Sequence, residues 1–276
     1  MKLPHPITQT NFDSPVKPGT GWPLDLATSK TPIAKNITQV RKLAREVKTL
    51  TELSAVISTC SACPRLVKWR TDIAVEKRKS FESEPYWGRP ATGFGVSDPA
   101  LLVVGLAPAA NGANRTGRIF TGDRSGDWLY RAMHKAGFAN QPTSVHSGDG
   151  LSLINARVLA AVRCAPPGNK PTPIERDTCA NWLTAEFQLL SATLKVIVAL
   201  GGFAWDQTIS TLLKDGFIAR KIKFGHNAKL EFVRADNRIL LLGSYHVSQQ
   251  NTFTGRLTEE MLDEIFRQAN QQISSS

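Results

Sequence analysis

The stretch LLVVGLAPAANGANRTGRIFTGD, residues 101–123, decides the type of fold. Its first six residues, 101–106, are apolar or glycine without interruption, which is typical of a strand that a sheet buries on both faces. A loop punctuated by glycines follows and ends at Asp123, where a helical pattern over residues 124–136 begins. A buried strand, a long loop and a helix in this order predict one unit of an α/β sheet.

Three further apolar runs alternate with helical patterns. The runs cover residues 157–162, 196–200 and 239–242, and the patterns cover residues 174–190, 204–213 and 258–268. This alternation predicts an α/β fold with three layers, α/β/α, around a short central parallel sheet. Ligand sites of such sheets lie beyond the carboxyl ends of the strands. We therefore expect the site in the loops after Leu106, Val162, Leu200 and Leu242.

The composition indicates a basic globular protein with a polyanionic partner. The chain has 276 residues and a formal net charge of +11, and its pI is near 9.7. This excess of positive charge favours nucleic acid as the partner, with an anionic membrane surface as the alternative. No apolar run approaches the roughly 18 residues of a spanning helix, and no signal peptide is evident. We therefore expect a cytoplasmic protein without a membrane partner and, by default, a monomer.

Two regions of the chain differ in composition. Residues 1–35 are rich in Pro, Gly, Thr and Asp without a sustained apolar period, which predicts an extended N-terminal arm. Residues 36–276 are expected to form a single domain. Apolar residues recur at helical spacing over residues 37–57, which predicts one amphipathic helix that ends shortly before Cys60.

The four cysteines suggest a shared metal site. Cys60 and Cys63 have the spacing of a metal clip, while Cys164 and Cys179 lie far along the chain. Two alternatives remain open from the residues alone: four unrelated buried thiols, or a redox pair of Cys60 and Cys63 beside two idle thiols. Four thiolates suit either zinc or an iron-sulfur cluster.

The loop over residues 105–123 has the small residues that allow a backbone to approach a ligand closely. It lacks the spacing of a nucleotide phosphate loop. Arg115 and Arg118 would place positive charge at the mouth of the site, where DNA phosphates could be met, or they are ordinary solvated arginines. Asp123 stands where the next helix begins, so an N-cap is the plain structural role for it.

Two more loops follow predicted strands. Residues 160–173 contain Cys164 and several prolines that stiffen the loop before the helix carrying Cys179. Residues 243–256 contain His246, which stands where a strand ends and a polar loop begins. Ser248, Gln249, Asn251 and Arg256 then supply donors for phosphates and base edges.

The three segments GLAPAANGANRTGRIFTGD, AAVRCAPPGNKPTP and SYHVSQQNTFTGRLT together resemble the motifs of the family 5, or B-type, uracil-DNA glycosylases. The resemblance covers roughly residues 59–269 in order. It implies a uracil-DNA glycosylase fold, DNA containing uracil or other deaminated bases as the partner, and a [4Fe-4S] cluster. Cys60, Cys63, Cys164 and Cys179 match the cysteines that hold this cluster in the family.

The resemblance also implies roles in removing a base that has been turned out of the duplex. Phe120 matches the aromatic residue that lies against the base, within a pocket to which Gly105 and Ala107 also belong. From the residues alone, a core phenylalanine under the loop is the alternative. We expect His246 to donate a hydrogen bond to the uracil oxygen and Asp123 to orient water or stabilise the sugar cation. Asn169 is a candidate for positioning water or contacting the sugar.

Two positions depart from related enzymes and bear on the choice of base. The neighbouring cluster-bearing family places an Asn near the end of the second strand, where this chain has Ala160. A pocket without that amide should discriminate less, so we expect hypoxanthine or other deaminated bases among the substrates. Asn111 stands where some family members have His, which argues against an acid-base role at this position.

Three other functions are compatible with parts of the pattern. A non-catalytic DNA-binding module with structural zinc would explain the charge and the cysteines but not the loops that hold Asp123 and His246. An iron-sulfur redox protein would lack any flavin or nicotinamide motif. A relative that captures uracil-DNA without turnover would form a persistent adduct with DNA.

Overall fold

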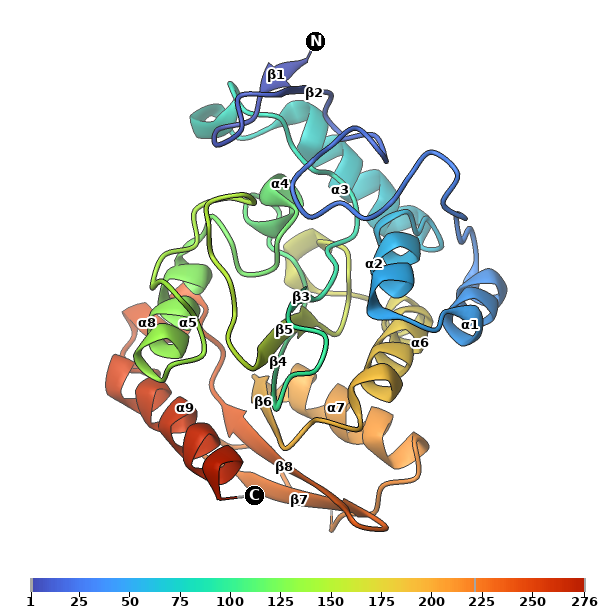
Figure 1. Cartoon of the computed structure of the whole chain (residues 1–276). Helices are drawn as coiled ribbons and strands as arrows, with labels where there is room; N and C mark the ends of the chain where they lie inside the picture. Colours follow the sequence, from blue (N-terminus) through green and yellow to red (C-terminus); the bar gives the residue numbers. More distant parts are fainter. Residues whose placement is uncertain (1, 221, 276) are drawn as a thin grey trace.

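The computed structural model describes residues 2–220 and 222–275, and its centre is a six-stranded sheet (Figure 1). The strand order is β3-β5-β4-β6-β8-β7. Four inner strands are parallel: β4 (Leu101–Gly105), β5 (Ala156–Ala160), β6 (Val196–Leu200) and β8 (Asn237–Ser244). The two edge strands, β3 (Phe94–Gly95) and β7 (Lys229–Arg234), are antiparallel to their neighbours.

Helices cover both faces of the sheet, which confirms the three-layer prediction. One face packs against α5 (Arg124–Lys135) and α9 (Glu259–Ser274), and the other against α6 (Pro173–Leu190) and α7 (Gly202–Lys214). Strand β4 shows why both faces of the sheet are buried. Leu101 and Val103 belong to the core on the first face, whereas Leu102 and Val104 belong to the core on the second. Successive side chains of a strand point to opposite faces, so an unbroken apolar run feeds two cores.

The prediction of one helix over residues 37–57 is wrong in one respect: the structure has two helices there. Helix α1 (Ile37–Glu46) ends before Lys48, and α2 (Leu50–Ser58) begins after Thr49. The Thr49 hydroxyl accepts from the backbone N–H of Glu52, whose carboxylate accepts from the backbone N–H of Thr49. This reciprocal cap starts a new helix although the apolar period continues through it.

Several short elements have no counterpart in the sequence-based prediction. Helix α3 (Pro64–Glu76) begins directly after Cys63, with proline at its first position. The others are β1 (Leu3–Pro4), β2 (Asn11–Phe12), α4 (Ala113–Thr116), α8 (Gln249–Phe253) and the 3-10 turns Lys79–Phe81 and Pro167–Asn169. None of the helices in the described ranges is long and apolar enough to cross a membrane.

The N-terminal segment, residues 2–35, packs against the rest of the chain near α3 and α4 (Figure 1). Phe12, Val16 and Trp22 form a small buried cluster with Trp87. The indole N–H of Trp22 donates to the backbone oxygen of Thr116 at 3.2 Å. The segment therefore supports α4, which lies inside the glycine-rich loop after β4.

Candidate active site and cysteine site

Phe120 lies at the carboxyl end of β4 in an unusual backbone conformation. Its φ is +50°, a value that a residue other than glycine adopts only when its surroundings hold it there. The Ser144 hydroxyl donates to the backbone oxygen of Phe120 at 3.2 Å, and a Cβ at Gly126 would overlap the same oxygen. A Cβ at Gly105 would come within 2.6 Å of the Phe120 ring. The ring therefore rests on the end of β4 and requires glycine there.

His246 follows β8 and lies near the same ring. The centroids of the Phe120 and His246 rings are 6.2 Å apart, with 38° between their planes. Asn251 donates to the backbone oxygen of His246 at 2.8 Å, which holds the loop. Gly201, directly after β6, has a φ of +92°, and a Cβ there would lie 3.3 Å from the Cβ of His246. Loops from three parallel strands thus converge on Phe120 and His246, as expected for a sheet of this class.

Burial sets the charge of His246. It lowers the pKa of the imidazole to about 4, so the ring is neutral near pH 7. In the described part of the chain, neither ring nitrogen has a hydrogen-bond partner. A neutral imidazole presents one N–H donor and one acceptor. The side chain can therefore give a hydrogen bond to a ligand without carrying a charge.

Asp123 caps α5, so its plain structural role is confirmed. One carboxylate oxygen accepts from the backbone N–H of Gly126 at 3.1 Å. The other oxygen lies against Gly112, where an added Cβ would overlap it. Burial raises the pKa of this carboxyl above its usual range, although the backbone N–H of Gly126 opposes the shift. The cap holds the carboxylate at the edge of the loop that carries Phe120.

The remaining predicted pocket residues differ in placement. Ala160, the last residue of β5, is buried and pairs with Gly105 across the sheet, close to the Phe120 ring. Ala107 follows β4 and is half-buried. Asn111 accepts a hydrogen bond from the Tyr86 hydroxyl at 2.9 Å, and sequence reasoning did not identify Tyr86.

Asn169 is exposed, in the 3-10 turn Pro167–Asn169, with a φ of +57°. Within residues 2–220 and 222–275, Asn169 makes no hydrogen bond or ring contact with Phe120 or His246, so the structure does not bring it together with them.

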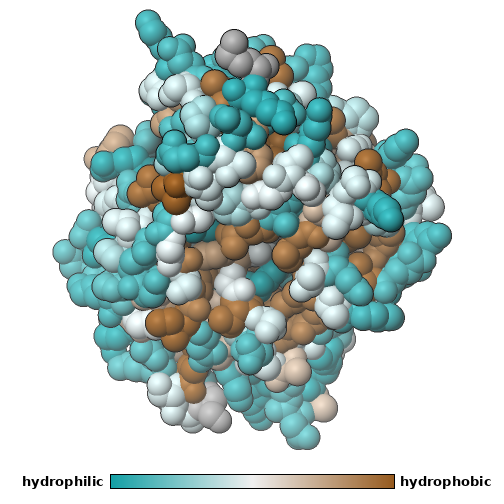
Figure 2. Space-filling view, turned by 45° about the horizontal axis from the view of Figure 1, so that its top comes forward, coloured by the Kyte–Doolittle hydropathy of each residue, from teal (hydrophilic) through white to brown (hydrophobic). Residues whose placement is uncertain are grey.

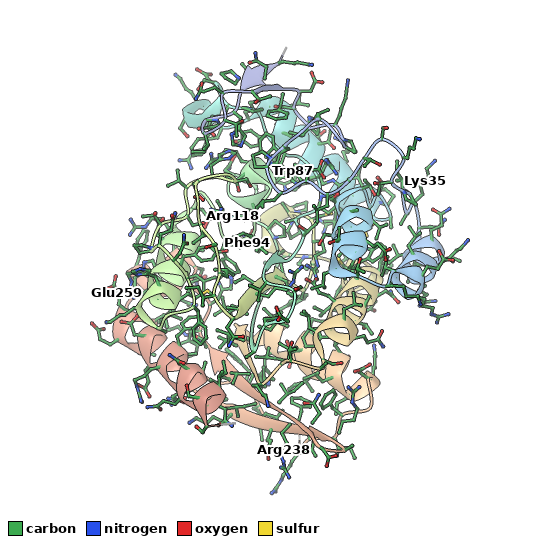
Figure 3. All side chains as sticks on the ribbon, in the orientation of Figure 1. Lys35, Trp87, Phe94, Arg118, Arg238 and Glu259 are labelled. Carbon is green, nitrogen blue, oxygen red and sulfur yellow. The ribbon has the colours of Figure 1, made fainter. Side chains whose placement is uncertain are left out.

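Arg115 and Arg118, which were predicted to contact DNA phosphates, are buried and paired with carboxylates. Only 4% of Arg115 and 2% of Arg118 is exposed. Arg115 pairs with Glu84 at 2.5 Å, and Arg118 pairs with Asp149 at 2.7 Å. The Arg118 guanidinium also lies over the Phe94 ring, 5.0 Å from its centroid, inside the molecule (Figure 3). Both cations already have internal partners, which disfavours a contact with DNA phosphates, and that contact stays a prediction.

The two DNA-binding candidates after His246 are more accessible. Ser248 is half-buried at the start of α8, and its hydroxyl makes no cap hydrogen bond. Arg256 is exposed and lies over the Tyr245 ring, 4.6 Å from its centroid. These side chains remain free to meet a ligand at the edge of the site.

The four cysteines line one small pocket. Cys60 and Cys63 precede α3, Cys164 follows β5, and Cys179 lies in α6. All four are free thiols. Burial, followed by the neighbouring Cys164 thiol, raises the pKa of Cys63 to about 12 and shifts those of Cys60 and Cys179 in the same direction. The fold therefore gathers thiols that are separated by more than 100 positions in sequence.

Hydrogen-bond donors already point at two of these sulfurs. The backbone N–H of Arg163 donates to Cys179 Sγ at 3.2 Å, and Arg70 Nη1 donates to Cys164 Sγ at 2.9 Å. Donors of this kind stabilise the thiolate form that binds metal. Among residues 2–220 and 222–275, however, no three His, Cys, Asp or Glu side chains are arranged to hold a single ion as they stand. Sequence reasoning missed Arg70, because its contact with Cys164 spans 94 positions and no local pattern indicates it.

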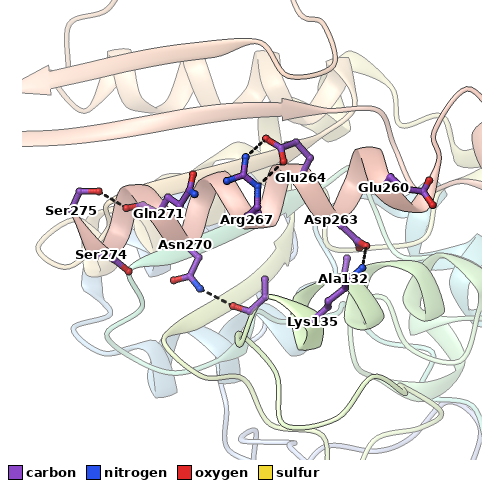
Figure 4. A pocket seen from close by; sticks show the side chains of 11 residues that line it. Ala132, Lys135, Glu260, Asp263, Glu264, Arg267, Asn270, Gln271, Ser274 and Ser275 are labelled. Atoms are coloured by element: carbon purple, nitrogen blue, oxygen red, sulfur yellow. Dashed lines mark hydrogen bonds and ion pairs between the residues drawn. The ribbon is translucent and has the colours of Figure 1, made fainter.

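Other grooves of the molecule do not contain the Phe120 and His246 site. One of about 970 Å³ runs between α5 and α9 and is lined by polar and charged side chains such as Lys135, Asp263 and Arg267 (Figure 4). Another groove, of about 470 Å³, lies beside β3. Separately, Figure 2 shows that hydrophobic side chains gather in the middle of one face of the molecule. Neither groove is lined by Phe120, Asp123 or His246. Cavity size alone therefore does not identify the site.

Comparison with known proteins assigns the class. The Uracil DNA glycosylase superfamily model matches residues 92–270, which include Phe120, Asp123 and His246. A type-5 uracil-DNA glycosylase of Mycobacterium bovis is 55% identical over 265 residues, covering 96% of this chain and 97% of that protein. A type-5 uracil-DNA glycosylase of Thermus thermophilus is 46% identical over 213 residues, covering 77% of this chain and 93% of that protein. A type-4 uracil-DNA glycosylase of Thermotoga maritima is 28% identical over 153 residues, covering 55% and 62%.

The chain belongs to the uracil-DNA glycosylase superfamily and, within it, to the type-5 family. This confirms the resemblance drawn from the three sequence segments.

Proposed function

We propose that this protein hydrolyses the N-glycosidic bond between uracil and deoxyribose in DNA, the first step of base excision repair. One observation supports this function most strongly: Phe120 and a neutral His246 meet at the carboxyl end of the sheet, inside the region matched by the family. An aromatic face and an uncharged donor suit a flat, uncharged base that has left the duplex.

In the proposed reaction the base lies against the Phe120 ring. As the bond between the base and the sugar breaks, negative charge develops on the base, and the His246 N–H donates to its carbonyl oxygen. The carboxylate oxygen of Asp123 that does not cap α5 orients the attacking water or stabilises the positive sugar. Asn169 is proposed to contact the sugar or that water from the exposed turn before α6, while Ser248 and Arg256 meet the DNA backbone.

Single-turnover release of uracil tests these roles. The informative variant is Asp123→Asn, because Asn caps helices about as well as Asp but carries no charge. We expect Asp123→Asn to melt close to the wild type and to release uracil about 10²-fold more slowly. His246→Ala should be slow as well, because its donor is lost. Wild-type rates in both variants would eliminate the assignment.

We propose that the base pocket also accepts hypoxanthine. The support is Ala160, whose methyl group lies beside Gly105 and can neither donate nor accept a hydrogen bond. A pocket that does not read the base edge with an amide rejects the wrong base less strongly. Ala160→Asn should lower hypoxanthine release relative to uracil release. A wild-type enzyme that processes uracil but leaves hypoxanthine untouched would refute this range.

We propose that Cys60, Cys63, Cys164 and Cys179 hold a [4Fe-4S] cluster. Their shared pocket, their free thiols and the donors to Cys164 and Cys179 support this assignment over unrelated thiols. When bound, the cluster would cross-link the segment before α3, the loop after β5 and α6. Hydrolysis of the N-glycosidic bond transfers no electrons, so it needs none from the cluster. Iron and sulfide analysis with a visible spectrum separates this proposal from zinc, which gives a colourless protein.

A further inference from the structure

Within residues 2–220 and 222–275, one of six buried arginines has no carboxylate partner. Five buried arginines form ion pairs: Arg89 with Asp25, Arg115 with Glu84, Arg118 with Asp149, and both Arg157 and Arg163 with Glu186. Arg70, on α3, is only 5% exposed and has no ion pair within residues 2–220 and 222–275. A buried guanidinium without a counter-charge is strongly unfavourable, so its environment should supply an anion.

The geometry around Arg70 indicates which group supplies that anion. Its Nη1 donates to Cys164 Sγ at 2.9 Å, and its Nη2 donates to the backbone oxygen of Cys60 at 2.9 Å. The planar guanidinium group of Arg70 thus contacts both parts of the cysteine site, which are the segment before α3 and the loop after β5. The proposed cluster, held by four thiolates, is anionic and would supply the missing negative charge beside this guanidinium.

The backbone of Arg70 connects this site to the base pocket. Asn114 Nδ2 donates to the backbone oxygen of Arg70 at 3.2 Å. Asn114 is 1% exposed and lies in α4, inside the loop between Gly105 and Asp123. In the same loop, Arg115 donates to the backbone oxygens of Asn111 and Gly122, at 3.0 Å each. A continuous set of hydrogen bonds therefore joins Cys164 to the loop that carries Phe120 and Asp123.

We propose that Arg70 is a positioning residue that links the cysteine site to the base-binding loop. Its guanidinium donates to the Cys164 sulfur and neutralises the thiolates, while its backbone oxygen anchors α4 through Asn114. This inference rests on the proposed cluster and deepens its role. An N–H···S hydrogen bond favours the more negative form of a cluster, so Arg70 raises its reduction potential. Loading of the cysteine site should also order residues 111–123.

The test compares cluster-loaded wild type with Arg70→Lys, Asn114→Ala and the control Lys68→Ala. A lysine ammonium cannot replace the two guanidinium nitrogens that donate to the Cys164 sulfur and to the Cys60 backbone oxygen at the same time. Asn114→Ala removes only the link to α4, and Lys68 pairs with Asp72 at the surface of the same helix. The readouts are the midpoint reduction potential, the rate at which a chelator bleaches the visible absorbance, and hydrogen exchange of residues 111–123.

We expect Arg70→Lys to have a more negative potential than the wild type, to bleach roughly tenfold faster and to exchange faster at residues 111–123. Asn114→Ala should exchange faster in the same residues at an unchanged potential, and Lys68→Ala should match the wild type. The inference is overturned if Arg70→Lys keeps the potential and bleaching rate of the control, or if Asn114→Ala exchanges as the control does. A failure of the proposed function would instead appear in the wild-type protein, as missing iron and sulfide or missing uracil release.

Discussion

Replacing Glu186 with Gln should destabilise the protein strongly, because two buried arginines share this carboxylate. Glu186 lies on α6 and is 1% exposed. Its oxygens lie 2.7 Å from Arg157 Nε and 2.5 Å from Arg163 Nη2. Arg163 Nε and Nη1 are buried and have no hydrogen-bond partner in the described part of the chain, so the carboxylate supplies most of the compensation for this cation.

The expected magnitude follows from the burial. Removing one partner of a buried ion pair costs about 3–5 kcal/mol of unfolding free energy, against roughly 5–15 kcal/mol for a whole protein. At roughly 2–4 °C per kcal/mol for a chain of this size, the Tm should fall by about 10 °C. Glu264→Gln is the matched control, because its pair with Arg267 lies at the surface, where solvent screens the attraction, and should contribute little to stability.

Thermal unfolding followed by circular dichroism measures both variants. A third protein, with Arg157, Arg163 and Glu186 all replaced by Met, should recover most of the lost stability, because it buries no charge. A Tm of Glu186→Gln equal to that of the Glu264→Gln control would refute this expectation.

The same ion pairs predict a pH dependence of stability. Burial raises the pKa of Glu186, but Arg163 and Arg157 outweigh this effect and the pKa lies below its usual range. The pair therefore stabilises above the unfolded pKa of about 4.3 and is lost as the pH falls through the lower folded pKa.

Three further predictions concern the site and its support. Gly112→Ala would push a methyl group into Asp123, so uracil release should slow, whereas Gly225→Ala, which meets open space, should leave single-turnover rates unchanged. Trp22→Ala should lower the unfolding free energy by about 3–5 kcal/mol in denaturant titrations, because the indole is buried and donates to Thr116; an unchanged midpoint would show that the N-terminal segment adds no stability. Burial, then His5, lowers the pKa of His146 to about 3, so stability should decline as the pH falls from about 6.5 toward 3, and His146→Phe should flatten this slope in melting curves.

The central sheet could be predicted because its signal is local. Residues 101–104 are apolar at every position, and the structure buries all four in two different cores. The caps were equally readable: Asp123 begins α5, and the pattern Thr49 to Glu52, which divides the first helix, is visible in the sequence. Strand β7 carried a weaker signal, since its alternating Leu230 and Phe232 face the core from the edge of the sheet.

The burial of charged residues could not be predicted from local patterns. Arg115 pairs with Glu84 and Arg118 with Asp149, and both partners lie about 31 positions away in sequence. No local sequence pattern indicates such a pair. From sequence alone, a buried arginine in a polar loop therefore cannot be told from one that contacts phosphate. The contact of Arg70 with Cys164 spans 94 positions and was missed for the same reason. The grouping of the cysteines, by contrast, was favoured by the metal-clip spacing of Cys60 and Cys63, and the family resemblance added the kind of cluster.

The most direct test of the central claim uses duplex oligonucleotides that differ only in one uracil or one thymine. The folded protein is incubated with each, free base is identified by mass spectrometry, and alkali then cleaves any abasic site. The function proposed here predicts free uracil and scission at the uracil position alone, with both lost in a protein carrying Asp123→Asn and His246→Ala. Intact uracil-containing strands after incubation with the folded, cluster-loaded wild type would contradict it.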